Sequence, residues 1–231
     1  SIHNLISRKR FESGREEAAL IIDCGGGTTD LASCRFAIEN DRVSYKVDIE
    51  TTYENGDTNF GGNNITYRIM QYIKIMFAAH YTNQGLVHID DIIQVASEDI
   101  FRYVDEFGRD EVYHRLEEAY AEAEKVIPTR FKNYENRTRD EYYMVKNNFY
   151  FLFDIADRMK KKFYAHDGVV RNRFQSNYER EDEDLRITQI DRWNLVVREN
   201  GQLVYNHNFP DVVFNIKEME LLLKADIYDI V

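Results

Sequence analysis

The chain has 231 residues, of which 43% are hydrophobic and 31% charged, a composition typical of folded soluble proteins rather than disordered ones. Its 30 lysine and arginine residues against 41 aspartate and glutamate residues give a net charge of −11. That balance argues against nucleic acid as a partner, because phosphate backbones are bound by basic surfaces. No apolar run is long enough to cross a membrane and the first residues lack a signal-peptide core, so we expect a cytoplasmic protein without a membrane partner.

A glycine-rich turn follows the first predicted strand, Ala18–Cys24, whose apolar residues suggest a buried position in a sheet. Gly25, Gly26 and Gly27 allow backbone N–H groups to approach an anion closely, and Thr28 adds a hydroxyl donor. We call Gly25–Thr28 the glycine turn. Asp23 and Asp30 flank it, and carboxylates beside a phosphate site make physical sense if Mg²⁺ or a water to be oriented lies between them. The alternative is an ordinary hairpin turn with two solvated aspartates.

Two further strands are expected after the turn, over residues 30–38 and from Val43 onward. In the third strand, apolar residues alternate with polar ones from Val43 to Thr51, which predicts a sheet with one buried face. Cys24 and Cys34 lie too far apart on this meander for a disulfide, so both should be free thiols.

A second glycine-bearing loop, residues 53–64, leads into a helix expected from Asn64 to Ala79. Gly61 and Gly62 stand just before that helix, where unpaired amides and the helix dipole both favour an anion. The alternative is a helix N-cap that follows a flexible corner. We call residues 53–64 the second loop.

The rest of the chain is predicted to be largely helical. Apolar periodicity indicates helices over residues 92–104, 112–126 and 140–164, ended in the first two cases by Gly108 and Pro128. A strand is expected over 169–174, a hairpin around Asn200-Gly201, and a last helix over 216–230. A composition shift near Ala79 predicts two subdomains: residues 1–79 with the sheet and both loops, and residues 80–231, helical with a β-hairpin and an inserted helical segment.

The two loops together carry a resemblance to a known family. Strand-Asp-x-Gly-Gly-Gly-Thr-x-Asp, then Asn-Gly-Asp-Thr-x-Phe-Gly-Gly before a helix, resembles the second lobe of the DnaK-type (seventy-kilodalton) heat-shock chaperones, within the actin, sugar-kinase and heat-shock ATPase superfamily. The resemblance implies an α/β fold, the second-lobe fragment of an actin-like (ribonuclease H-like) ATPase. It covers residues 18–79, and the order of elements extends it to 140–231. The first lobe, a later Gly-Gly motif and a peptide-binding domain have no counterpart, so a piece of a longer protein is expected.

The resemblance also implies roles for individual residues. By it, the glycine turn holds the β- and γ-phosphates of ATP or ADP, and Gly61 and Gly62 lie beside the nucleotide. Asp23 and Asp30 match carboxylates that act around Mg²⁺, which makes Asp23, Thr28 and Asp30 the candidate catalytic residues. The family's Glu-x-x-Lys-Arg motif, which contacts adenine and ribose, has a weaker match in Asp157, Lys160 and Lys161. That match has two alternatives: a solvent-facing charge pair beside a basic cluster, or a frame over residues 118–125.

The implied function belongs to the full-length protein: a chaperone ATPase that binds ATP and Mg²⁺ between two lobes and contacts a client protein or co-chaperone. Because phosphoryl transfer needs groups positioned from both sides, the fragment alone is expected to be inactive. Two alternatives stay open. One is another actin-like ATPase or a small-molecule kinase, and the other is a non-catalytic interaction module that uses tyrosine-rich helices.

Overall fold

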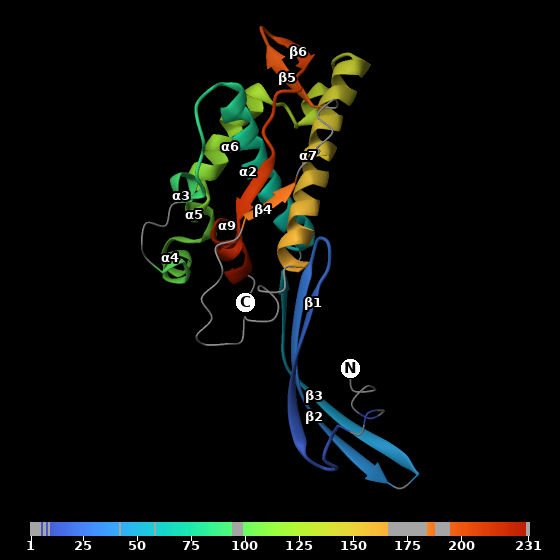
Figure 1. Cartoon of the computed structure of the whole chain (residues 1–231). Coiled ribbons are helices and arrows are strands. Elements are labelled where there is room, and N and C mark those ends of the chain that lie inside the picture. Colours follow the sequence, from blue (N-terminus) through green and yellow to red (C-terminus); the bar gives the residue numbers. More distant parts are fainter. Residues whose placement is uncertain are drawn as a thin grey trace. The chain divides into compact units, whose positions relative to one another are not determined.

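Figure 1 shows the computed structural model of the chain, a mixed α/β fold. The structure describes residues 10–41, 43–57, 59–93, 99–165, 184–187 and 195–229, together with Ile6 and Arg8. The chain divides into two compact units, unit 1 from Ser1 to Asn64 and unit 2 from Ile65 to Asp229. The division falls near the start of helix α2 (Gly62–Tyr81), whereas the subdomain boundary expected after Ala79 falls near its end.

Unit 1 contains a three-stranded antiparallel sheet in the order β1 (Glu16–Cys24), β2 (Thr29–Asp41) and β3 (Ser44–Asp57). The predicted meander is therefore confirmed, with a register shift between Ser33 and Cys34 on β2. β3 is longer than expected and includes Asn55-Gly56-Asp57, the first half of the second loop, because these residues continue the ladder with β2. Both cysteines are free thiols, as predicted.

Burial in this sheet differs from the expectation. A small core forms on β2 from Cys34, Phe36 and Ile38. On β1, predicted to be a buried strand, Leu20, Ile21 and Ile22 are 66%, 55% and 60% exposed, and Val43 and Ile49 on the predicted buried face of the third strand are exposed as well. Leu20 and Ile22 lie on one face of β1 and Ile21 on the other, and all three are exposed. The apolar pattern therefore identifies the strand without showing that either of its faces is covered.

Unit 2 is built mainly from helices around one hydrophobic core. The long helices α2 and α7 (Arg139–Ala165) were expected within two residues of their observed ends. The shorter helices are α3 (Ile89–Ile92), α4 (Ile100–Phe107), α5 (Arg109–Val112), α6 (His114–Val126), the 3-10 helix η1 (Phe131–Tyr134) and α9 (Ile216–Tyr228). Within the described ranges, every helix is too short or too polar to span a bilayer.

Two of the helical predictions need correction. The helix expected over residues 92–104 is not one element, because Ile92 ends α3 while α4 begins only at Ile100; residues 94–98 lie outside the described part. The helix expected over 112–126 begins only at His114, because the backbone leaves helical geometry at Tyr113, which has ψ of 3°. Gly108 does end α4, with φ of 86°.

Short strands complete unit 2. β4 (Asp184–Ile187) pairs antiparallel with β7 (Val212–Asn215), and β5 (Val196–Glu199) forms a hairpin with β6 (Gln202–Tyr205). The turn residues of that hairpin, Asn200 and Gly201, both have positive φ, 48° and 82°, as a two-residue type I′ turn requires. This confirms the predicted hairpin. The strand expected over 169–174 lies outside the described residues.

The N-terminus of α9 is capped by Asn215 and Glu218, as their spacing predicted. The Asn215 side chain accepts a hydrogen bond from the Lys217 N–H at 2.9 Å, and the Glu218 carboxylate accepts one from the Asn215 N–H at 3.2 Å. Asn215→Ala should lower the free energy of unfolding by about 1 kcal/mol, because a helix-capping acceptor is lost. Urea unfolding measures this. Asn133→Ala, at an exposed position, is the control and should change stability by less than about 0.5 kcal/mol; equal effects would contradict the capping role.

Candidate functional site

The glycine turn joins β1 to β2 and leaves three consecutive backbone amides without an acceptor. The last cross-strand pair is Cys24 with Thr29, and the Gly25 N–H donates to the Thr28 carbonyl at 2.8 Å. The N–H groups of Gly26, Gly27 and Thr28 donate to no residue in the described part of the chain, and these three residues are exposed. Successive unpaired amides of this kind form a concave site for an anion.

The second loop lies directly against the glycine turn. The Gly62 N–H donates to the Gly25 carbonyl at 2.9 Å, and the Asn63 N–H donates to the Gly26 carbonyl at 2.7 Å. The sequence suggested that the first amides of α2 are left open for an anion. The amides of Gly62 and Asn63 are instead paired with carbonyl groups of the turn. These two bonds use carbonyl oxygens of the turn, so the N–H groups of Gly26, Gly27 and Thr28 stay unpaired within the described residues.

Gly61 is in close contact with the turn. A β-carbon added at Gly61 would lie 2.6 Å from the Gly27 nitrogen, 2.7 Å from the Thr28 nitrogen and 2.8 Å from the Gly25 carbonyl oxygen. A β-carbon does not approach non-bonded nitrogen or oxygen atoms so closely, so only glycine lets the loop and the turn meet here. The structure thus brings together the two glycine motifs that the sequence singled out.

A buried hydroxyl adds a further connection between the turn and the loop. Thr29 is only 2% exposed, and its Oγ1 lies 3.1 Å from the Phe60 carbonyl oxygen and 3.3 Å from Cys24 Sγ. The sequence reading missed this role for Thr29. The alternation of strand side chains contained the signal, because an outward Asp30 places its neighbour Thr29 on the opposite face.

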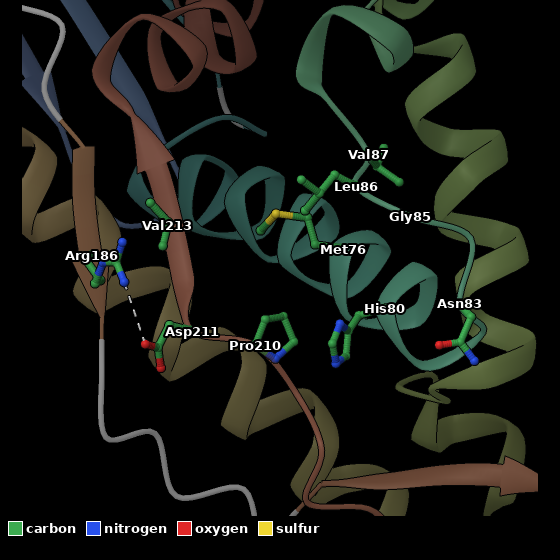
Figure 2. A pocket seen from close by; sticks show the side chains of 10 residues that line it. All are labelled: Met76, His80, Asn83, Gly85, Leu86, Val87, Arg186, Pro210, Asp211 and Val213. Atoms are coloured by element: carbon green, nitrogen blue, oxygen red, sulfur yellow. Dashed lines mark ion pairs between the residues drawn. The ribbon is translucent and has the colours of Figure 1, made fainter.

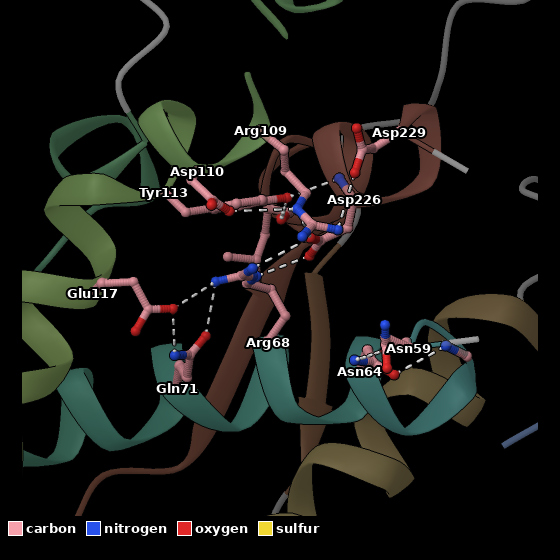
Figure 3. A network of polar contacts seen from close by, with 12 residues as sticks. Asn59, Asn64, Arg68, Gln71, Arg109, Asp110, Tyr113, Glu117, Asp226 and Asp229 are labelled. Carbon is pink, nitrogen blue, oxygen red and sulfur yellow. Dashed lines mark hydrogen bonds and ion pairs between the residues drawn. The ribbon is translucent and has the colours of Figure 1, made fainter. Parts of the chain in front are cut away.

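The second loop is also held by its own side chains (Figure 3). Asn64 accepts a hydrogen bond from the Gly61 N–H at 2.9 Å and donates one to the Asn59 carbonyl at 2.9 Å. Asp57 accepts one from the Asn59 N–H at 2.7 Å. These contacts fix the loop that supports the turn.

The two predicted metal-side carboxylates are a directly opposed pair. Asp23 and Asp30 are cross-strand partners on β1 and β2, so their side chains share a face of the hairpin next to the turn. Like charges in this arrangement repel, which a bound cation would relieve. A β-carbon at Gly56 would lie 2.9 Å from Asp30 Oδ1, so the carboxylate rests against the bare Cα of that glycine.

Within the described ranges, no three histidine, cysteine or acidic side chains gather as a metal site. A cation between Asp23 and Asp30 would therefore depend on these two carboxylates together with phosphate oxygens and water. Mg²⁺ is commonly held in this way, by one or two carboxylates and the phosphates of a substrate.

The weaker motif match, Asp157, Lys160 and Lys161, lies on α7 in unit 2. Asp157 forms ion pairs with Lys160 at 3.0 Å and with Lys161 at 2.6 Å, and the hydrogen bond from Lys161, followed by that from Lys160, holds the pKa of Asp157 below its usual range. Lys160 also donates to Thr66 Oγ1 on α2 at 2.5 Å. The structure thus brings the three residues together, with Lys160 engaged inside unit 2 and Lys161 exposed.

A second polar cluster, in unit 2, serves the fold (Figure 3). Arg68 donates to Asp226 at 2.8 and 3.2 Å and to Glu117 at 3.1 Å, and its guanidinium lies 3.6 Å from the centre of the Tyr113 ring. The Tyr113 hydroxyl in turn donates to the Leu222 carbonyl at 2.9 Å. These contacts join α2, α6 and α9, and the charges compensate one another.

A hollow of about 630 Å³ in unit 2 is chemically different from the turn (Figure 2). Its lining is mainly apolar, and its one described ion pair joins Arg186 to Asp211 at 3.9 Å. The residues that line it are Met76, His80, Asn83, Gly85, Leu86, Val87, Arg186, Pro210, Asp211 and Val213. The glycine turn, unlike this hollow, is formed by the two glycine motifs that the sequence singled out, so it is the better candidate site.

Comparison with known proteins assigns no family to this chain, so its function is inferred from the geometry of the glycine turn. The chain matches no protein-family model, and no curated protein is significantly similar to it.

Proposed function

We propose that the chain is part of the ATP-binding domain of a DnaK-like molecular chaperone and contributes phosphate and Mg²⁺ contacts to ATP binding and hydrolysis in the full-length protein. The observation that carries the proposal is the run of three unpaired amides, Gly26 to Thr28, in a turn supported by a second glycine loop. The motifs that resemble the chaperone family are the same two segments.

The residues present fit a magnesium nucleotide. The glycine turn would hold the β- and γ-phosphates through its amides and the Thr28 hydroxyl, while Asp23 and Asp30 would lie around Mg²⁺ and its waters. The ion neutralises phosphate charge during phosphoryl transfer. Asp30 would be oriented for this role by its contact with Gly56.

Hydrolysis makes a stricter demand than binding. Phosphoryl transfer depends on groups positioned on both sides of the reacting phosphate, and the turn provides one side. Nucleotide binding, rather than turnover by this segment, is therefore the property to measure.

The test is calorimetric titration of the full-length protein with MgADP. Gly26→Val should weaken binding by at least about tenfold, because a branched side chain beside the unpaired amides would hinder the approach of a phosphate. Asp23→Ala should weaken it by a similar factor through the lost Mg²⁺ contact. Asp41→Ala, at the far end of β2, is the matched acidic control and should leave binding unchanged. The absence of any heat with the wild-type protein would overturn the proposal.

Removal of the metal should reverse the effect of the carboxylates on ADP affinity. With EDTA and ADP, Asp23 and Asp30 would face the phosphates without a cation between, so Asp23→Asn should bind ADP at least as tightly as the wild type. With Mg²⁺ present, the same variant should bind more weakly. An Asp23→Asn effect of the same sign in both conditions would contradict a role at the metal.

Another actin-like ATPase or a small-molecule kinase would use the same turn. The region beyond the nucleotide site separates these alternatives: a peptide-binding region in the full-length protein favours the chaperone, and its lack favours the kinase.

A protein-interaction module is the second candidate function, favoured by an aromatic surface on α7 and η1. Phe131 packs against Tyr142, Phe149 and Tyr150, with ring centroids 5.7–6.3 Å apart, and Tyr150 is 55% exposed. Exposed aromatic side chains are common in protein interfaces. This module becomes the leading candidate if the wild-type protein gives no heat with MgADP.

A further inference from the structure

We infer that the side-chain amide of Asn63 is an additional donor to the phosphates held at the glycine turn. The inference rests on the proposed function and adds to it a residue outside the two glycine motifs. Asn63 is the second residue of α2. Its side chain lies close to Gly26 of the glycine turn and forms no hydrogen bond with any described residue.

The backbone fixes where this side chain starts. The Asn63 N–H donates to the Gly26 carbonyl at 2.7 Å, and the neighbouring Gly62 N–H donates to the Gly25 carbonyl at 2.9 Å. Two adjacent bonds of this kind hold the first turn of α2 to the glycine turn. The Asn63 Cα therefore cannot move away from Gly26 without breaking them.

The side chain itself lies over Gly26. Measured from the β-carbon position at Gly26, Asn63 Nδ2 is 3.4 Å away, Cγ is 3.8 Å away and Oδ1 is 3.9 Å away. The amide group thus lies close to Gly26, the first of the three residues with an unpaired N–H group. It is exposed, and it forms no hydrogen bond with any residue that the structure describes.

The next residue shows what a structural asparagine looks like in this loop. Asn64 uses both ends of its amide, accepting from the Gly61 N–H and donating to the Asn59 carbonyl, each at 2.9 Å. Asn63 uses neither end within the described part of the chain. The two neighbours therefore form a matched pair, one committed to the loop and one available to a ligand.

The chemistry suits a phosphate oxygen. The carboxylates Asp23 and Asp30 lie beside the turn and need a cation before they tolerate phosphate, whereas the Asn63 amide is a neutral donor that extends the row of backbone N–H groups. A hydrogen bond from this amide to a charged phosphate oxygen is the kind that contributes most to affinity.

The test uses the full-length protein, titrated with MgADP, with inorganic pyrophosphate and with adenosine. Asn63→Ala should weaken binding of MgADP and pyrophosphate by about tenfold, the effect of losing one hydrogen bond to a charged group, and should leave adenosine affinity unchanged. Asn63→Asp should weaken both phosphate ligands further, because a carboxylate repels them. Its unfolding midpoint should stay the same or rise, since an acidic residue in the first helical turn interacts favourably with the helix dipole.

The outcomes are distinguishable. If the wild-type protein binds MgADP and Asn63→Ala binds it equally well, the inference is overturned and the proposed function stands. If Asn63→Ala lowers the unfolding midpoint as much as Asn64→Ala does, its effect is structural and the inference also fails. If the wild-type protein binds neither MgADP nor pyrophosphate, the proposed function fails and the inference falls with it.

Discussion

Gly61→Ala should weaken MgADP binding by about a hundredfold, although it adds a single methyl group. The added carbon would lie 2.6–2.8 Å from three backbone atoms of the glycine turn, and backbone atoms cannot rotate aside as a side chain can. Either the turn or the second loop must shift. A displacement on the order of 1 Å is enough to misalign donors with a phosphate and to cost a factor of about 10².

The same variant should also be less stable, by about 1–3 kcal/mol, because overpacking strains its surroundings. Gly27→Ala is the matched control for stability. A β-carbon at Gly27 meets nothing within 4 Å, and this residue does not have positive φ, so its unfolding free energy should change little. Calorimetry with MgADP and urea unfolding of the two variants measure both effects. A Gly61→Ala protein with wild-type affinity would show that the two loops are not held together as described.

The second large effect is expected at a buried ion pair in unit 2, where Glu124→Gln should lower the free energy of unfolding by about 3 kcal/mol. Lys74 is fully buried, forms an ion pair with Glu124, donates to Thr129 Oγ1 at 2.9 Å, and lies 4.2 Å from the centre of the Tyr120 ring. Glu124 is the acidic partner that compensates this charge. Gln keeps an oxygen for the backbone N–H groups of Thr129 and Arg130, each 3.0 Å away, so the variant isolates the loss of charge.

The loss of stability in Glu124→Gln should depend on pH in a defined direction. Burial lowers the pKa of Lys74 to about 8, even though Glu124 raises it, and without Glu124 the pKa should fall further. A lysine whose pKa is lower in the folded protein than in the unfolded chain gains stability as pH rises, because the unfolded chain then binds more protons. The deficit of Glu124→Gln relative to the wild type should therefore be largest near pH 6 and shrink by pH 9, where Lys74 is mostly neutral in both proteins.

Lys74→Met is the matched control for this pair. It removes the buried charge and leaves Glu124, which is 17% exposed, with its hydrogen bonds from Thr129 and Arg130. The loss of stability should be smaller than for Glu124→Gln, since the charge left unpaired is that of a partly exposed carboxylate that keeps its hydrogen bonds, rather than that of a fully buried ammonium group. Urea unfolding at both pH values measures the series, and a deficit that is independent of pH would contradict the role assigned to Lys74.

The sequence predicted best those features that depend on neighbouring residues. The glycine turn, the Asn200-Gly201 hairpin and the cap at Asn215 follow from local backbone chemistry, and all three are present. Periodicity located α2 and α7 for the same reason, because one helix face repeats within a few residues.

Features that depend on distant partners could not be predicted in this way. Lys74 and Glu124 are 50 residues apart, and nothing in either segment indicates the other. The contact of Gly61 with the glycine turn is of the same kind, because the motifs suggest two phosphate loops but not that one supports the other. Exposure of Leu20–Ile22 was missed because an alternating or apolar pattern identifies a strand, whereas burial depends on what covers the sheet.

The position of β1 has a practical consequence for work with this chain. Its outer side carries a row of backbone hydrogen-bonding groups with no strand beside it in the described residues, next to the uncovered side chains of Leu20, Ile21 and Ile22. Such an edge is a template for intermolecular strand addition, which leads to aggregation. Natural sheets often guard against this with a charged residue on the edge, so a lysine at Ile21 is a rational starting point for a soluble crystallisation variant.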